Sequence, residues 1–263
     1  MTKITLQHIM DKRKRGEKIT MLTAYDYPTA RLLDRAGIDI VLVGDSLANV
    51  VLGLDSTVKI GMDIMVPLAA AVSRGVERAL VVADMPFEAY QPAGADEVKS
   101  ARRLVDEAGC DAVKVEWFQW CDEVVKSLRA ADIQVMGHVG LTPQTAQEFK
   151  VQGRDSASAQ AIIQQAKILE EAGCFAVVLE CVPEDLAREI TAGMKVPTIG
   201  IGAGKFCDGQ VLVLHDMLGL NERKVPKFVK KYADISSEIV KAVQLYKEEV
   251  GSGKFPGPEQ SFH

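Results

Sequence analysis

The sequence predicts a (β/α)8 barrel, also called a TIM barrel, on three observations. Short apolar runs rich in valine, isoleucine and leucine recur eight times along most of the 263-residue chain. Segments with helical periodicity lie between several of these runs. The runs are continuously apolar, which is typical of parallel strands buried on both faces. Eight such units within about 200 residues suit a closed barrel better than the alternative, an open doubly wound sheet.

The elements can be placed along the chain in order. The predicted strands span residues 20–25, 38–43, 79–83, 112–115, 133–137, 175–179, 196–201 and 210–214. The clearest predicted helices span residues 28–36, 96–108, 158–172 and 184–192. Three of them end in Ala-Gly, at Gly37, Gly109 and Gly173, where glycine can adopt the left-handed conformation that closes a helix.

The end of the chain departs from this repeat. Residues 228–249 are predicted to form one or two further helices, and residues 251–263 an extended arm. No linker rich in Pro, Gly and Ser divides the chain. We therefore expect one domain over residues 1–263.

Composition excludes several classes of protein. The net charge of −5 lacks the basic excess of a nucleic-acid-binding surface. The one basic cluster, residues 12–15 (KRKR), is interpreted as a solvated loop or helix end. Five cysteines without a Cys-x-x-Cys pair fit a reducing cytosol. The sequence has neither a signal-peptide-like start nor an apolar run of about 18 residues, so we expect a cytoplasmic protein with no membrane partner.

Polar residues end most of the predicted strands, where the catalytic groups of such barrels lie. Polar residues also mark where strands stop, but so many carboxylates at one rim favour a functional site. The residues are Asp26, Asp45, Asp84, Glu116, His138, Glu180 and His215.

Three of these carboxylates suggest a metal site. Asp45, Asp84 and Glu116 end consecutive strands, so they should be neighbours, and carboxylate oxygens suit Mg2+. Lys114 lies two residues before Glu116 and should face the same way. It could bind a substrate carboxylate or polarise a carbonyl group; the alternative is an ion pair with no chemical role.

Two further features leave alternatives open. Residues 200–204 (GIGAG) follow a strand and form either an anion-binding turn or a purely structural one. Residues 117–120 (WFQW) form either core packing or a lid over a flat ligand.

Eight motifs occur along the chain in a specific order. They are residues 21–27 (MLTAYDY), 43–46 (VGDS), 81–87 (VVADMPF), 112–116 (AVKVE), 137–144 (GHVGLTPQ), 150–154 (KVQGR), 179–183 (LECVP) and 200–204 (GIGAG). In these motifs and their order, the chain resembles the ketopantoate hydroxymethyltransferase family over nearly its full length. The resemblance itself implies a (β/α)8 barrel.

The resemblance also implies a reaction and a set of site residues. The implied reaction transfers a hydroxymethyl group from 5,10-methylenetetrahydrofolate to 3-methyl-2-oxobutanoate, giving 2-dehydropantoate on the route to pantothenate and coenzyme A. Glu180 is implied as the proton acceptor. The implied Mg2+ ligands are Asp45, Asp84 and Glu116, and the implied 2-oxo acid-binding residues are Asp45, Ser46, Asp84 and Lys114. Members of the family are cytosolic homo-oligomers, usually decamers.

The chemistry accounts for these residue types. The C3 hydrogen of a 2-oxo acid is weakly acidic, and a metal ion can stabilise the resulting enolate as a Lewis acid. Lys114 would add positive charge where negative charge develops, and Glu180 would act as general base. The folate methylene supplies the electrophile, so no protein nucleophile is needed.

Three positions depart from the family pattern, and other functions remain as alternatives. Trp117 and Phe118 replace a Gly-Gly pair, residues 145–149 form a shorter loop without glycines, and Gln260 replaces a histidine. The first two departures should flank the site and bear on substrate size and folate contacts. The alternatives are a metal-dependent 2-oxo acid lyase or aldolase of the phosphoenolpyruvate mutase and isocitrate lyase type, and a non-catalytic paralogue.

Overall fold

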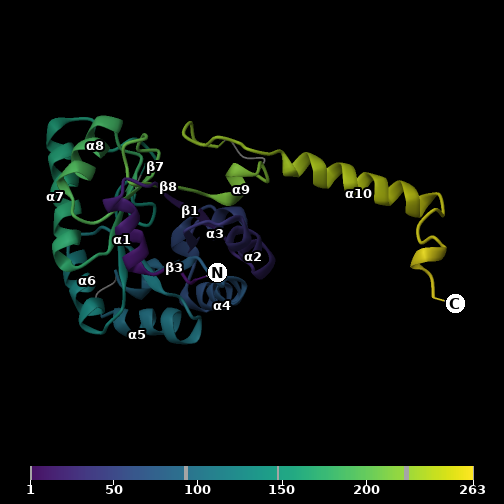
Figure 1. Ribbon diagram of the computed structural model, residues 1–263, viewed down its shortest axis with the longest axis horizontal. Coiled ribbons are helices and arrows are strands. Elements are labelled where there is room, and N and C mark those ends of the chain that lie inside the picture. The colour runs from purple at the N-terminus through teal and green to yellow at the C-terminus, as the bar shows by residue number, and fades with distance from the viewer. Residues whose placement is uncertain (1, 92–93, 147, 222–224, 263) are drawn as a thin grey trace. The chain divides into compact units, whose positions relative to one another are not determined.

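Eight parallel strands form a closed barrel in chain order, with the last strand paired to the first (Figure 1). The computed structural model describes residues 2–91, 94–146, 148–221 and 225–262. The strands are β1 (Ile19–Thr23), β2 (Ile40–Val43), β3 (Leu80–Asp84), β4 (Ala112–Glu116), β5 (Val135–Gly140), β6 (Ala176–Glu180), β7 (Thr198–Ile201) and β8 (Gly209–Leu212). The predicted (β/α)8 barrel is confirmed.

Helices follow most of the strands and pack around them (Figure 1). They are α1 (Leu6–Lys14), α2 (Tyr27–Ala36), α3 (Leu47–Val50), α4 (Met62–Gly75), α5 (Glu97–Arg102), α6 (Cys121–Ala130), α7 (Ser156–Ala172), α8 (Glu184–Gly193), α9 (Leu214–Met217) and α10 (Ile235–Gly251). Shorter elements are the 3-10 turns η1 (Thr57–Lys59), η2 (Phe87–Ala89) and η4 (Pro258–Gln260), and the π-helical stretch η3 (Arg103–Glu107). Gly37 and Gly173 close α2 and α7 in the left-handed conformation, as predicted.

The sequence did not predict α4, and its burial explains why. This helix contacts α2, η3 and two strands. Its apolar residues therefore occur on more than one side, which weakens a 3.6-residue period. Pro67 inside the helix also argues against a helix from sequence alone.

The strict alternation of strand and helix fails between β7 and β8. The seven residues 202–208 connect these parallel neighbours without a helix. A four-residue strand is only about 13 Å long, and seven residues can span up to about 23 Å, so a loop suffices to return the chain. Gly202 and Gly204 have positive φ values of 65° and 75° that allow the tight reversal. Gln210 Nε2 donates to Gly204 O at 2.8 Å, so residues 200–204 include a structural turn.

Helix α1 packs against the core at the ends where the strands begin. Ile9 is fully buried in the same core cluster as Ile19 and Ile40. Residues 12–15 form the last turn and C-cap of α1, so the interpretation as a helix end is confirmed, but two of the four side chains are mostly buried rather than solvated. Lys12 Nζ lies 2.6 Å from Asp39 Oδ2, and Arg13 Nε lies 3.2 Å from Asp208 Oδ2, with both basic side chains less than a quarter exposed.

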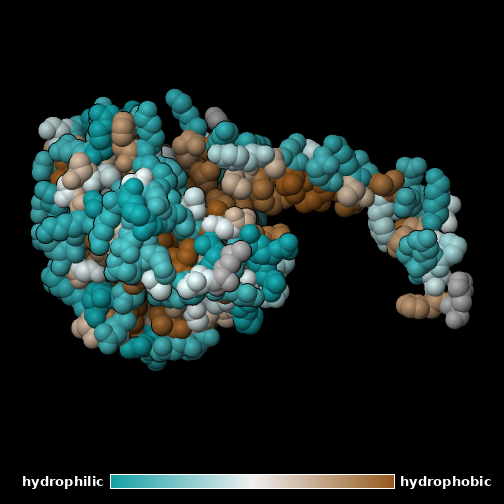
Figure 2. Space-filling model, viewed as in Figure 1, coloured by the Kyte–Doolittle hydropathy of each residue, from teal (hydrophilic) through white to brown (hydrophobic). Residues whose placement is uncertain are grey.

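Contacts within the chain divide it into two compact units, Met1–Val213 and Leu214–His263. The second unit contains α9, α10 and η4. Helix α10 begins at Ile235, later than predicted, and no residue of it is buried; its apolar side chains are visible in Figure 2. The predicted extended arm contains the short turn η4, and its last residue, His263, lies outside the described residues. Among the described helices, none is long and apolar enough to cross a membrane.

Candidate active site

Five of the predicted rim residues come together at the C-terminal ends of neighbouring strands. Strand pairing places Asp84 beside Lys114, Glu116 beside His138, and Gly140 beside Glu180. Asp45 follows β2, the strand that pairs with β3. Parallel register thus brings side chains far apart in the sequence to one end of the barrel.

Two residues of the predicted rim behave differently. Asp26 caps the start of α2, where its carboxylate accepts the backbone N–H of Thr29 at 2.8 Å. Its role as an N-cap explains why an aspartate stands there. His215 is not at a strand end, because β8 ends at Leu212 and His215 lies three residues later, in α9 of the second unit.

Asp84 and Lys114 form the centre of the cluster. Both side chains are almost completely buried, and Lys114 Nζ lies 3.0 Å from Asp84 Oδ1. Asp84 Oδ2 accepts the backbone N–H of Asp45 at 3.0 Å. Ser46, the next residue, has its hydroxyl 2.8 Å from that of Tyr25 on the preceding strand-end loop. The predicted 2-oxo acid-binding residues therefore occupy one buried region.

Negative charge dominates this region. Burial, followed by the charges of Asp84 and Glu116, raises the pKa of Asp45 to about 8. Burial alone would lower the pKa of Lys114, but the nearby carboxylates, led by Asp84, outweigh it and raise the pKa. Lys114 therefore keeps its proton at neutral pH and forms an ion pair with Asp84.

His138 lies between the carboxylates of Glu116 and Glu180. Its Nδ1 lies 3.6 Å from Glu116 Oε1, and its Nε2 lies 3.2 Å from Glu180 Oε2. Burial and the charge of Lys114 lower the pKa of His138, yet the two glutamates outweigh them and raise it to about 9. The sequence placed His138 at the rim without a role; its position between two carboxylates was decided by strand register.

Gln144 and Tyr90 are site residues that the sequence did not single out. Gln144 Nε2 donates to Asp45 Oδ2 at 3.0 Å, and the Gln144 backbone N–H donates to Glu116 Oε2 at 2.9 Å. The Tyr90 hydroxyl donates to Gln144 Oε1 at 2.7 Å. The only sequence signal was that Gln144 closes the motif at residues 137–144.

The residues present fit a divalent cation that takes few protein ligands. Across the described parts of the chain, no three His, Cys, Asp or Glu side chains converge as a ready ligand group. Mg2+ typically uses one or two carboxylates and completes its shell with water and substrate oxygens. Asp84 Oδ1 is already paired with Lys114, but the buried carboxylates Asp45, Asp84 and Glu116 outnumber this one lysine, and that excess of negative charge would favour a cation here.

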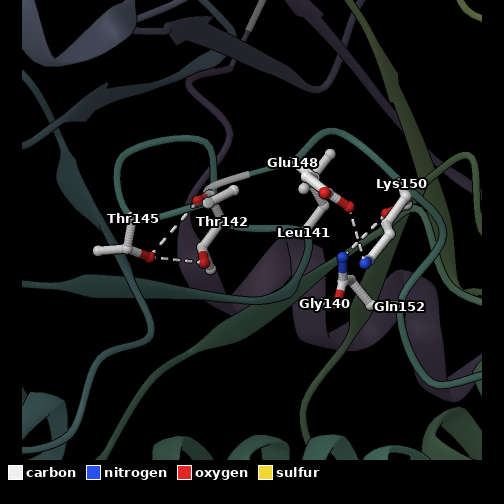
Figure 3. A pocket seen from close by; sticks show the side chains of 8 residues that line it. Gly140, Leu141, Thr142, Thr145, Glu148, Lys150 and Gln152 are labelled. Atoms are coloured by element: carbon white, nitrogen blue, oxygen red, sulfur yellow. Dashed lines mark hydrogen bonds and ion pairs between the residues drawn. The ribbon is translucent and has the colours of Figure 1, made fainter.

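A polar hollow of about 360 Å³ lies at the end of β5 (Figure 3). The shortened loop after β5 forms most of its wall; position 147 in that loop lies outside the described residues. The Leu141 backbone N–H donates to the carbonyl of Glu180 at 2.9 Å, which ties the hollow to the strand that carries the proposed base. The lining residues are Gly140, Leu141, Thr142, Thr145, Ala146, Glu148, Lys150 and Gln152.

The aromatic run at residues 117–120 packs against Tyr90 through Phe118. The ring of Phe118 meets the rings of Tyr90 and Trp120 edge-on, with centroids 5.5 Å and 5.3 Å apart. Phe118 therefore supports Tyr90, while Trp120 remains 45% exposed.

Comparisons with known proteins agree with this geometry. The family model described as ketopantoate hydroxymethyltransferase matches residues 3–258. The 3-methyl-2-oxobutanoate hydroxymethyltransferase of Syntrophus aciditrophicus is 54% identical, over 99% of this chain and 97% of that protein. The enzyme of the same name from Moorella thermoacetica is also 54% identical, over 99% and 98% of the two chains.

Solved structures with low sequence identity share the fold. A phosphonopyruvate hydrolase in complex with oxalate and Mg2+ matches with a TM-score of 0.64 at 14% identity, covering 99% of this chain and 93% of that one. A 2,3-dimethylmalate lyase of the phosphoenolpyruvate mutase and isocitrate lyase superfamily matches with a TM-score of 0.62 at 13% identity, covering 100% and 92%. The full-length family match and the high identity to its members decide the relationship: the chain belongs to the ketopantoate hydroxymethyltransferase family.

Proposed function

We propose that this chain transfers a hydroxymethyl group from 5,10-methylenetetrahydrofolate to 3-methyl-2-oxobutanoate, giving 2-dehydropantoate and tetrahydrofolate. The observation that carries the proposal is the buried cluster of acidic groups around Lys114, with Glu180 at its edge, in a chain of this family. We also propose that the reaction serves pantothenate and coenzyme A synthesis in the cytoplasm, and that the enzyme is a homo-oligomer, a decamer.

The cluster is suited to binding a 2-oxo acid and a divalent cation together. Asp45, Asp84 and Glu116 would hold Mg2+, because carboxylate oxygens are ligands that this cation prefers. When bound, Mg2+ withdraws electron density from the keto oxygen and makes the C3 hydrogen more acidic. Lys114 places a fixed positive charge beside the substrate oxygens, and the Ser46 hydroxyl offers a hydrogen bond.

Glu180 then takes the C3 proton. Its carboxylate is partly exposed, at 17%, so it can face a substrate in the barrel mouth. His138 Nε2 lies 3.2 Å from this carboxylate, within ion-pair distance. The electrons of the C3–H bond form the new bond to the folate methylene carbon. The methylene carbon starts with two bonds to folate nitrogens, and both break with their electrons leaving on nitrogen. C3 of the 2-oxo acid replaces one of these bonds, and the oxygen of a water molecule replaces the other. The C3 proton and one proton of that water end on the two folate nitrogens, which gives 2-dehydropantoate and tetrahydrofolate.

The alternatives have weaker support. The lyase and the hydrolase among the solved structures are only 13–14% identical to this chain, and this similarity supports a shared fold but not a shared reaction. A non-catalytic paralogue would have no use for buried charged groups such as Asp84 and Lys114, whose desolvation is costly.

Proton NMR of 3-methyl-2-oxobutanoate in D2O with Mg2+ tests the proposal. We expect the C3 proton to exchange, and a hydroxymethyl signal to appear only when 5,10-methylenetetrahydrofolate is added. Exchange of the C3 proton without hydroxymethyl transfer would refute the proposal that the folate supplies the one-carbon unit. Neither exchange nor transfer would refute the reaction as a whole.

A further inference from the structure

Gln144 contacts two of the three proposed metal-binding carboxylates at once. Its side-chain Nε2 donates to Asp45 Oδ2, and its backbone N–H donates to Glu116 Oε2. The residue is 5% exposed, so neither hydrogen bond competes with bulk water. One residue on the loop after β5 thus connects the ends of β2 and β4.

The surroundings of Gln144 fix the orientation of its amide. Nε2 also donates to the carbonyl oxygen of Met85 at 3.0 Å, and both of its partners are acceptors. Oε1 receives the Tyr90 hydroxyl at 2.7 Å and Gln91 Nε2 at 3.0 Å, and the glutamine partner can only donate there. A flipped amide would place oxygen against two acceptors, so the Nε2–Asp45 bond is required by the network.

Tyr90 completes the network and links it back to the same carboxylate residue. Its hydroxyl accepts the backbone N–H of Glu116 at 3.0 Å while it donates to Gln144. Burial raises the pKa of Tyr90 well above its usual value, so the hydroxyl keeps its proton. Both polar atoms of the Gln144 side chain and the Tyr90 hydroxyl therefore have partners, which makes this buried network rigid.

We propose that Gln144 is a positioning residue, supported by Tyr90, that holds the carboxylates of Asp45 and Glu116 ready for the divalent cation. This inference rests on the proposed function. The network engages one oxygen of each carboxylate and leaves the other for cation, water or substrate. Groups behind the ligands commonly change metal affinity by about 10–100-fold when removed.

The test measures Mn2+ binding by electron paramagnetic resonance, with no substrate present. Gln144→Met keeps the length of the side chain and the backbone N–H bond to Glu116, but removes the amide. We expect its Kd for Mn2+ to rise about 10–100-fold. Raising Mg2+ should restore kcat in the transfer assay, because the variant needs more metal and keeps the reacting groups.

A matched control lies on the same loop. Thr145 is exposed, and its hydroxyl contacts that of Thr142 at 2.9 Å, away from the carboxylates. Thr145→Ala should leave the Mn2+ Kd unchanged. A smaller rise in Kd is expected for Tyr90→Phe, which removes only the hydroxyl and keeps the ring that packs on Phe118.

Several results would overturn the inference. The first is a folded Gln144→Met protein with the wild-type Mn2+ Kd. The second is a lower kcat that extra Mg2+ does not restore, as a structural defect would give. Should Gln144→Met not fold, an unchanged Kd in Tyr90→Phe decides against the inference. A wild-type protein that binds no Mn2+ would overturn the proposed metal site as well, whereas equal binding by wild type and variants overturns this inference alone.

Discussion

Replacing Glu180 with glutamine removes the proposed proton acceptor while keeping the shape of the side chain. The amide oxygen can still face His138 Nε2, which lies 3.2 Å from the wild-type carboxylate, but the amide cannot accept a proton at neutral pH. A positioned general base contributes about 10²–10⁴-fold to a rate. At about 1.36 kcal/mol per factor of ten, this loss corresponds to about 2.7–5.4 kcal/mol in the barrier.

The assay separates proton removal from binding. In Glu180→Gln, deuterium exchange at C3 of 3-methyl-2-oxobutanoate, followed by proton NMR, should slow by about 10²–10⁴-fold. Calorimetry should give a 2-oxo acid affinity close to wild type, because the buried cluster around Lys114 is untouched. Wild-type exchange rates in this variant would refute the assignment of Glu180 as the base.

Glu148 provides a matched control. It lies on the nearby rim loop with a side chain 70% exposed and an ion pair of 2.9 Å to Lys150. Exposed pairs of this kind contribute about 0–1 kcal/mol. The Glu148→Gln variant should therefore catalyse exchange of the C3 proton at the wild-type rate. If exchange slows equally in both variants, the rim loop causes the effect, and the argument for Glu180 as the base is lost.

Other parts of the structure give further predictions. Asp84→Ala should weaken Mg2+ and 2-oxo acid binding together, by at least about a hundredfold, because loss of outer groups alone costs 10–100-fold; unchanged Mg2+ affinity by calorimetry would refute its role. Lys12→Met removes a charged hydrogen bond to a buried aspartate and should cost about 1.5–3 kcal/mol in urea unfolding. Lys14→Met, whose ion pair is exposed, should change stability by less than about 0.5 kcal/mol, and equal effects would contradict the argument. Gly140→Ala should lower the free energy of unfolding by about 1–3 kcal/mol, because the φ of Gly140 is +95° and a β-carbon there would collide with the next strand. Gly193→Ala is the control in the same unfolding measurement, because a β-carbon at Gly193 would have no atom within 4 Å to collide with.

Local patterns in the sequence predicted much of the barrel. Continuous apolar runs gave the eight strands, and Ala-Gly endings gave the closure of α2 and α7 at Gly37 and Gly173. Both signals depend on neighbours within a few residues. The sequence did not predict α4, because burial on several sides of the helix removes the 3.6-residue hydrophobic period. It also did not predict that a loop without a helix connects β7 to β8, which is possible because both strands are short.

The predicted site was a set of residue types at strand ends. The sequence correctly placed five of these residues at one rim of the barrel: Asp45, Asp84, Lys114, Glu116 and Glu180. Their chemical roles remain predictions. The same reasoning included Asp26, because a helix cap and a rim carboxylate look alike in sequence. It overlooked Gln144, since a neutral amide on a loop carries no chemical signal until its partners are known.

The sequence by itself determined the barrel class, the family and the set of charged residues available for chemistry, because strand burial and strand ends leave local patterns. Tertiary structure decided which atoms meet. Parallel register set His138 between Glu116 and Glu180, and the loop after β5 brought Gln144 onto Asp45. These contacts join residues 22 to 99 positions apart, for example Asp45 and Gln144 at 99 and Glu116 and His138 at 22. Such pairings depend on closure of the whole barrel, which no local pattern in the chain specifies.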